Sequence, residues 1–215
     1  MMELLPAHQL EASKDCEKLI KASEGLELKS YPCGAGKWTI GYGSTEGVEP
    51  NMTITPAEAE ILLRKDISVA EDIVRNFFRN VPMHQGMFDA LVSFAMNFGQ
   101  KMGSYSLASL IRDPKVQSIR VAKKMLEYQY TKRDDDGDGD LDAVIDDGLP
   151  IRRHREALMA IGFSFDVASA VVTRESLNMR ETRIPWLNGG YKEIHEVVTP
   201  FSDLEKKARA MNAFL

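Results

Sequence analysis

Apolar residues recur at helical spacing over a long central stretch of the chain. The stretch opens with Thr55-Pro56-Ala57-Glu58, ends at Val81-Pro82, and carries on one face Leu62, Val69, Ile73 and Phe77. Threonine before proline, with glutamate three residues after the threonine, predicts an N-cap, a first helical residue and a capping box. The spacing predicts a helix of about six turns, which at about 1.5 Å per residue spans ~30 Å and can connect two lobes.

The second helical pattern is denser in apolar residues. It runs from about Met83 to Phe98 and stops at Gly99, a residue type that favours helix ends. Its apolar density predicts the core of a larger, helical lobe. Further helices are predicted near residues 107–111, 119–130 and 151–161. Ser202-Asp203-Leu204-Glu205 predicts a capping box that opens a final amphipathic helix.

Alternation replaces helical spacing between Glu24 and Thr45. Leu26, Leu28 and Tyr31 begin an extended run, residues 32–36 supply turn chemistry, and residues 37–42 alternate between polar and apolar. The pattern predicts a helix that ends at Glu24 and leads into a small β-hairpin. The predicted fold class is therefore α+β and mainly helical, with a small N-terminal hairpin lobe.

The hairpin carries candidate chemistry. Glu24 stands at the predicted helix end, and Cys33 and Thr39 stand on the predicted strand pair. A carboxylic acid that faces a thiol and a hydroxyl can place an acid and a water-activating group on opposite walls of a cleft. Cys33 as a small buried hydrophobe and Thr39 as a β-branched strand former are the structural alternatives.

Composition and charge narrow the class of protein. A chain of 215 residues with 44% apolar content can form one sizeable core or two lobes that share one. It lacks a run of ~20 apolar residues and a signal-peptide pattern, so we expect a soluble protein made in the cytoplasm. Cys16 and Cys33 are too few for a disulfide framework, which favours a reducing compartment. The four histidines are too far apart in sequence to indicate a zinc site.

Residues 134–147 hold eight aspartates and no basic residue. Without these eight negative charges the net charge of −5 becomes +3, so the rest of the chain is mildly basic and suits an anionic polymer. The chain has no basic stripe with interleaved aromatics, so a nucleic-acid partner is not expected.

The spacing of the aspartates resembles a calcium-binding EF-hand loop. Counted from Asp134, the ligand positions one, three, five, seven and nine fall on Asp134, Asp136, Asp138, Asp140 and Asp142. Position twelve is Ile145 where a glutamate is wanted, so Asp146 would have to substitute. Hard oxygen ligands favour calcium, and mutual repulsion of the carboxylates favours a counter-ion over the alternative of a solvated acidic loop.

Several segments together resemble the phage-type lysozymes, the muramidase endolysin family. The matching segments, from roughly Lys18 to Leu158, are Leu19-Ile20-Lys21 with Glu24-Gly25-Leu26, Tyr31-Pro32-Cys33, residues 38–43, Ile54-Thr55 with Ala59-Glu60 and Leu62-Leu63, residues 88–99, and Gly148-Leu149 with Arg152, Arg153 and Glu156. The resemblance implies a two-lobed lysozyme-like fold with a long connecting helix. It also implies hydrolysis of the β-1,4 bond between N-acetylmuramic acid and N-acetylglucosamine in bacterial peptidoglycan, for host cell lysis.

The resemblance also implies roles for single residues. Glu24 falls on the essential glutamate and would protonate the leaving oxygen. Cys33 stands where many members carry aspartate and a minority cysteine, and Thr39 would hold the water of an inverting displacement. Asn97 is a candidate substrate contact, and Arg152 could pair with Glu24. Alternatively, residues 152–155 form a solvated helix face with Glu156.

The resemblance predicts a catalytic domain over residues 1–161, with the acidic insertion at about 134–147. Residues 162–215 are predicted to be an extension packed on that domain, with a turn at Trp186-Tyr191, and either purely structural or a wall-binding or partner surface. We expect a monomer without organic cofactor that acts at the bacterial cell wall after release. The alternative functions are a lytic transglycosylase and a non-catalytic wall-binding or virion protein.

Overall fold

The computed structural model describes residues 2–33, 36–129, 131–133, 142–144, 148–185 and 191–213. Within residues 131–133, 142–144, 180–185 and 191–196 it describes the backbone alone. The chain divides into two compact units, Met1–Pro114 and Lys115–Leu215, and each is treated by itself. This division by internal contacts differs from the domains predicted from sequence, and the domain boundary after residue 161 stays a prediction.

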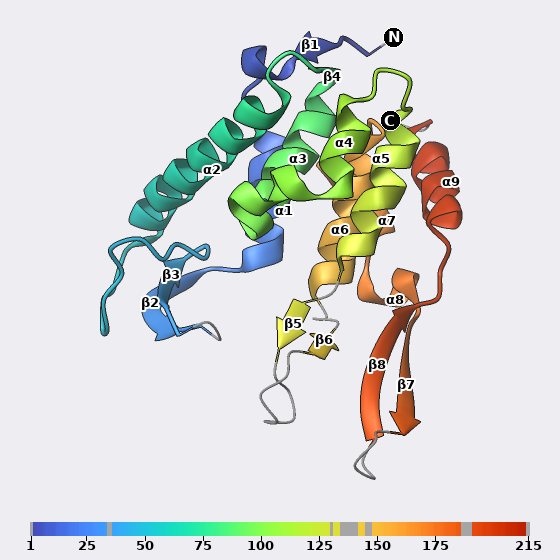
Figure 1. The fold of residues 1–215 in the computed structure, drawn as a ribbon. Helices are drawn as coiled ribbons and strands as arrows, with labels where there is room; N and C mark the ends of the chain where they lie inside the picture. Colours follow the sequence, from blue (N-terminus) through green and yellow to red (C-terminus); the bar gives the residue numbers. More distant parts are fainter. Residues whose placement is uncertain are drawn as a thin grey trace. The chain divides into compact units, whose positions relative to one another are not determined.

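The first unit is mainly helical, as predicted (Figure 1). Its helices are α1 (Lys14–Glu24), α2 (Pro56–Phe78), α3 (Gln85–Phe98) and α4 (Ser106–Arg112), with short 3-10 turns at Ala7–Gln9 and Gly99–Ser104. The capping box of α2 is confirmed: the Glu58 backbone N–H donates to the Thr55 hydroxyl at 3.2 Å, and the Thr55 N–H donates to the Glu58 carboxylate at 2.7 Å.

Helix α3 forms the centre of the first unit's core, and both α1 and α2 contact it. All residues from Met87 to Ala95 are buried, so this helix has no solvated face along that stretch. Each fully buried Leu, Val or Phe side chain contributes about 1.5–3 kcal/mol relative to exposure. The helix ends where Gly99 adopts φ 52°, as the sequence predicts.

The predicted hairpin is formed by β2 (Glu27–Pro32) and β3 (Trp38–Gly41), which pair antiparallel. Tyr31 lies opposite Thr39 in the register. Beyond the strand ends, the Cys33 N–H donates to the Lys37 carbonyl at 2.8 Å, and this bond closes the loop. The hairpin follows α1 and precedes α2, so the chain brings the end of α1 next to it (Figure 1).

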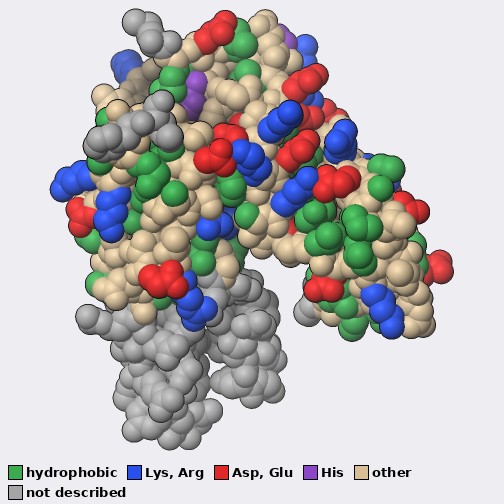
Figure 2. Space-filling view, turned by 180° about the vertical axis from the view of Figure 1, so that it is seen from behind, with side chains coloured by type: hydrophobic (Ala, Val, Ile, Leu, Met, Phe, Trp, Pro, Cys, Tyr) green, Lys and Arg blue, Asp and Glu red, His purple; other side chains and the backbone are tan. Residues whose placement is uncertain are grey.

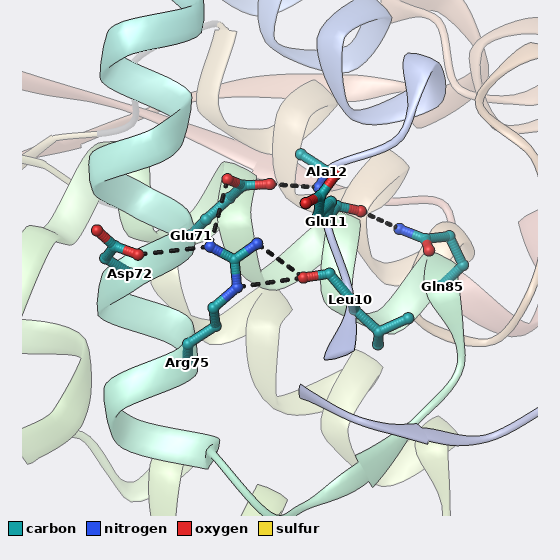
Figure 3. A network of polar contacts seen from close by, with 7 residues as sticks. All are labelled: Leu10, Glu11, Ala12, Glu71, Asp72, Arg75 and Gln85. Carbon is teal, nitrogen blue, oxygen red and sulfur yellow. Dashed lines mark hydrogen bonds and ion pairs between the residues drawn. The ribbon is translucent and has the colours of Figure 1, made fainter. Parts of the chain in front are cut away.

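The N-terminal segment is fixed by α2 and α3 (Figure 3). Arg75 donates from Nε and Nη2 to the Leu10 carbonyl at 3.2 and 2.8 Å, and Gln85 donates to the Glu11 carbonyl at 2.7 Å. The Ala12 N–H donates to the Glu71 carboxylate at 2.5 Å. The strand β1 (Leu5–Pro6) pairs with β4 (Pro82–Met83). Polar and charged side chains here form hydrogen bonds with backbone groups that lie outside helices and sheets.

The second unit is built around α6 (Gly148–Ala160), which contacts helices before and after it in sequence. Its other helices are α5 (Ser118–Met125), α7 (Phe165–Val171), α8 (Arg174–Leu177) and α9 (Phe201–Asn212), with a 3-10 turn at Leu126–Tyr128. Two hairpins pair β5 (Thr131–Arg133) with β6 (Asp142–Val144), and β7 (Met179–Pro185) with β8 (Tyr191–Val197). The predicted helices near 119–130 and 151–161 are confirmed.

One capping prediction in the second unit is wrong. Helix α9 begins at Phe201 with Pro200 as N-cap and no side-chain cap, so Ser202 lies inside the helix and forms no capping box. The buried Phe201 side chain and the fixed φ of Pro200 set the start two residues earlier, with Pro200 instead of Ser202 as N-cap. The turn predicted at Trp186-Tyr191 falls at residues 186–190, outside the described residues.

No helix in the described part of the chain is both long and apolar enough to cross a membrane. On the face shown in Figure 2, Lys and Arg side chains are interspersed with Asp and Glu.

Candidate active site

Glu24 is the last residue of α1, and its side chain is exposed. The helix ends because Gly25 adopts φ 73°, a conformation that costs glycine little, and its N–H donates to the Lys21 carbonyl at 3.2 Å. Gly43, which follows β3, approaches the acid closely: a Cβ added at Gly43 would lie 3.4 Å from Glu24 Oε2. With φ 96°, Gly43 holds a conformation that a larger residue rarely adopts. Two glycines thus set the position of this carboxyl group relative to the hairpin.

The two other predicted catalytic residues lie on the hairpin. Thr39 is buried, with 4% of its surface exposed, and its hydroxyl donates to the Lys37 carbonyl at 3.5 Å, the long limit for a hydrogen bond. Cys33 is half-buried, directly follows β2 and is not part of a disulfide. Cys16, the other cysteine, is fully buried in α1 and contacts the Asp89 carbonyl at 3.5 Å.

Tyr31 belongs to this site, although the sequence reasoning used it only as a strand residue. It lies directly opposite Thr39, two residues before Cys33, and 40% of its surface is exposed. Partial burial raises the pKa of the Tyr31 phenol, and the nearby negative charges of Glu27, Glu24 and Cys33 raise it further. Glu24 and Cys33 therefore both lie within electrostatic range of one phenol. Its cross-strand pairing with Thr39 is the signal that could have identified it.

A polar cluster connects the last turn of α1 to α2 and to the turn after β3. Lys21 Nζ lies 2.6 Å from Glu60 Oε2 and 5.7 Å from the centroid of the Tyr42 ring, and the Tyr42 hydroxyl donates to Glu60 Oε1 at 3.2 Å. The bond from Lys21 lowers the pKa of Glu60, while burial and then Glu60 raise the pKa of Tyr42. Sequence reasoning missed this cluster because its members are far apart along the chain.

Asn97 lies exposed in the last turn of α3, in the first unit. Its predicted substrate contact stays a prediction, since no ligand tests it. Arg152 lies in the second unit, on α6, so its predicted pairing with Glu24 also stays a prediction.

The alternative of a solvated face on α6 is wrong. Arg152, Arg153, His154 and Glu156 are all buried. Glu156 accepts from Arg152 Nε at 3.3 Å and from Arg153 Nη1, so one buried carboxylate serves two guanidinium groups. Burial lowers the pKa of His154, whose ring contacts the Pro150 carbonyl at 2.8 Å. Residues 152–156 contain four charged residues, a composition typical of an exposed helix face. The neighbouring helices that bury them cannot be inferred from the local sequence.

The predicted calcium ligands Asp134, Asp136, Asp138, Asp140 and Asp146 lie outside the described residues, and Asp142 is described only as the first backbone position of β6. Among the described side chains, no three His, Cys, Asp or Glu residues gather so that they could hold a metal ion. The calcium site therefore stays a prediction.

An acid at a helix end that faces a small hairpin, on a mainly helical chain, is the arrangement of a lysozyme-type fold, and comparison with known proteins identifies the family. Residues 21–156, more than half of the chain, match the family described as phage lysozyme. The chain belongs to this family. The matched range contains Glu24, Cys33, Thr39, Asn97 and Arg152.

One similar protein is the endolysin of Acyrthosiphon pisum secondary endosymbiont phage 1, which is 38% identical over 94 residues. The match covers 44% of this chain and 62% of that protein, less than two thirds of its length.

Two solved structures are similar over most of their own length. The muramidase domain of SpmX from Asticaccaulis excentricus aligns with TM-score 0.62 and 26% identity, over 70% of this chain and 97% of that one. The endolysin from Escherichia coli O157:H7 phage FAHEc1 aligns with TM-score 0.60 and 30% identity, over 71% and 94%. These alignments confirm the lysozyme-like α+β fold.

Proposed function

We propose that the protein is an endolysin that hydrolyses the β-1,4 bond between N-acetylmuramic acid and N-acetylglucosamine in peptidoglycan. The observation that carries the proposal is the placement of Glu24 at the end of α1, against Gly43 and beside a hairpin that bears Cys33 and Thr39. Membership of the phage lysozyme family and the likeness to a muramidase domain support it.

In the proposed reaction Glu24 donates a proton to the leaving oxygen of the glycosidic bond. Exposure of its side chain makes it accessible to a polymeric substrate. A water molecule held by Thr39 and Cys33 attacks the anomeric carbon from the opposite face, and the configuration inverts. The Thr39 hydroxyl donates to the Lys37 carbonyl, so the lone pairs of its oxygen stay available to accept a hydrogen bond from that water. A thiol, with an ordinary pKa of about 8.5, activates water more weakly than a carboxylate at neutral pH.

Substrate contacts are proposed for Asn97 and Arg152. The exposed amide of Asn97 can bond to a sugar hydroxyl or an acetamido group. Arg152 is oriented by Glu156, and we propose that its guanidinium contacts the substrate. We also propose that the protein is a monomer that is made in the cytoplasm and acts at the cell wall after release.

The test is digestion of purified peptidoglycan, followed by turbidity and by mass spectrometry of the products. We expect a fall in turbidity and fragments with reducing-end N-acetylmuramic acid. Anhydro-muramic acid ends would identify a lytic transglycosylase instead, and the absence of turnover in the folded protein would identify a non-catalytic wall protein.

We also propose that calcium binds the segment 134–147. Eight carboxylates within fourteen residues repel one another unless a cation neutralises them. An ion that binds only the folded protein raises its stability, by about 2.7 kcal/mol at a hundredfold excess over the dissociation constant. The test is thermal unfolding across a chelator-to-calcium titration, with a variant in which Asp134, Asp136 and Asp138 are changed to Asn as the control. An unresponsive parent protein would contradict the calcium proposal.

A further inference from the structure

Tyr31 is an exposed aromatic side chain beside the candidate catalytic residues. Among the Phe, Tyr and Trp side chains that the structure describes, it alone is exposed, with 40% of its surface accessible. A single exposed apolar residue is common on soluble proteins and by itself indicates nothing. The surroundings of the Tyr31 ring are what distinguish it.

The hairpin places Tyr31 on the same face as Thr39 and Cys33. Tyr31 and Thr39 are direct cross-strand partners, and such partners project from one face of a sheet with Cβ atoms about 4.5–5.5 Å apart. Side chains alternate between the two faces along a strand, so Cys33, two positions after Tyr31, belongs to this face as well. The bond from the Cys33 N–H to the Lys37 carbonyl continues the pairing past the end of β2.

The proposed acid lies near the same ring. Burial raises the pKa of the Tyr31 phenol most, followed by the negative charges of Glu27, Glu24 and Cys33. Such interactions weaken with distance, so Glu24 on α1 and Cys33 on the hairpin are both neighbours of the phenol. The direction of the shift keeps the phenol protonated at neutral pH, where its hydroxyl can donate a hydrogen bond.

The chemistry of this side chain suits a sugar. A pyranose ring has an apolar face of C–H groups and a rim of hydroxyl and acetamido groups, and tyrosine offers an apolar ring with one polar end. Ligand sites combine such aromatic side chains with a few placed polar groups. In the proposed reaction the water held by Thr39 and Cys33 attacks the anomeric carbon of N-acetylmuramic acid. This sugar must therefore lie over the face that carries Tyr31.

We infer that Tyr31 is a substrate-binding residue whose ring packs against the N-acetylmuramic acid unit that is cleaved, while its hydroxyl donates a hydrogen bond to that unit. The inference rests on the proposed function, which supplies the sugar and the side from which water attacks. Tyr31 holds the sugar against Thr39 and Cys33 and transfers no proton. Its loss therefore weakens binding more than it slows the chemical step.

The experiment measures binding separately from cleavage. Isothermal titration calorimetry with soluble peptidoglycan fragments gives dissociation constants in a Glu24→Gln background, which we expect to leave the fragments intact. In that background Tyr31→Leu, which removes the ring but keeps an apolar side chain, should weaken binding about tenfold. Tyr31→Phe keeps the ring and loses only the hydroxyl, so it should weaken binding about threefold. With Glu24 present, both changes should raise KM by similar factors and alter kcat less than about twofold.

Nitration is a second readout, and it reports on the phenol itself. Tetranitromethane modifies accessible tyrosines, and mass spectrometry of the peptides locates the modified residue. Bound fragments should slow the nitration of Tyr31 in proportion to the fraction of sites occupied. A tyrosine that only stabilises the hairpin would be nitrated at the same rate with and without fragments.

Met52 supplies the matched control. Its side chain is exposed to a similar extent, 37%, and the Ser30 N–H donates to its carbonyl at 2.9 Å along the other edge of β2. Lys29 pairs with Thr53, so Ser30 lies opposite Met52, on the face that Tyr31 does not share. Met52→Ala should therefore leave the dissociation constant and KM unchanged.

Parent-like binding by Tyr31→Leu, or nitration of Tyr31 that bound fragments do not slow, would overturn the inference. A loss in Tyr31→Phe as large as that in Tyr31→Leu would overturn the packing of the ring against the sugar. The parent protein separates these failures from failure of the proposed function. If the parent releases reducing-end N-acetylmuramic acid and Tyr31→Leu binds normally, only the role of Tyr31 is wrong. If the parent neither cleaves nor binds the fragments, the proposed function fails and the inference is overturned with it.

Discussion

Two polar networks in the first unit differ in what their charged groups bind. At the N-terminal segment, Arg75, Glu71 and Gln85 bond to backbone atoms of residues 10–12 (Figure 3). Near the active site, Lys21, Glu60 and Tyr42 contact one another's side chains. Side chains that satisfy backbone groups fix the path of the chain, whereas side chains that satisfy one another set local charge. We therefore expect the first network to govern stability and the second to govern the local charge beside the hairpin.

The largest expected effect is that of Glu24→Gln. The amide keeps the shape of the acid but has no proton to donate, so activity on peptidoglycan should fall at least about hundredfold. Because the side chain is exposed, the melting temperature should stay within about 1 °C. Turbidity assays measure the loss of activity, and thermal unfolding measures the melting temperature. Substantial residual cleavage would show that another residue is the acid.

The next effect concerns the thiol. Cys33→Ala should lower activity roughly tenfold to hundredfold because alanine cannot position water. Cys33→Asp should match or exceed the parent, since an ionised carboxylate activates water better at neutral pH. Initial rates of the two variants, measured side by side, check this. Parent-like activity in Cys33→Ala would mean that the thiol only packs.

In the N-terminal network, Arg75→Met should lower stability without a comparable loss of activity. The change removes both bonds to the Leu10 carbonyl and leaves that group, in a buried residue, without these donors. A buried unsatisfied group costs about 1–3 kcal/mol. Denaturant unfolding measures the loss, and activity below the transition should remain close to that of the parent. A variant as stable as the parent would show that the network does not hold the segment.

Asp89→Asn should have the smallest effect, a change in how the stability of the protein depends on pH. Burial raises the pKa of Asp89 above its ordinary value of 3.8, although Ser13 and Gln85 donate to its carboxylate. A raised carboxyl pKa means that the stabilisation is present at low pH and is lost as pH rises through the folded-state pKa. An asparagine keeps the acceptor and does not titrate. We therefore expect the parent to lose stability relative to Asp89→Asn as pH rises from about 4. Parallel stability curves for the two proteins would contradict this.

The same contrast explains what could be predicted from the sequence. Helix α2 was predictable because its capping box is a local signal, and so was the hairpin with its alternation and glycines. The face predicted for α2 was partly wrong, because Val69 is exposed and the buried face includes Leu63, Ile67 and Ala70 instead. Glu24, Cys33 and Thr39 were predicted as site residues from the order of the family motifs along the chain. The cluster of Lys21, Tyr42 and Glu60 was not predictable, because Lys21 and Glu60 are 39 positions apart in the sequence and no local signal indicates their contact.

Burial was the second feature that the sequence did not provide. Residues 152–156 carry four charged side chains and a histidine, yet Arg153 and Glu156 are fully buried. Only the packing of neighbouring helices around α6 determines this. For the same reason, the start of α9 depends on the buried Phe201 rather than on the polar residues that follow it.

The central claim is that Glu24 acts as the acid of a hydrolytic cleavage. Mass spectrometry of peptidoglycan digested by the parent protein in ¹⁸O-labelled water, with Glu24→Gln as the control, tests it most directly. We predict reducing-end N-acetylmuramic acid that carries one ¹⁸O atom in the parent digest and intact polymer with the variant. Anhydro ends without label, or labelled fragments from Glu24→Gln, would contradict the account.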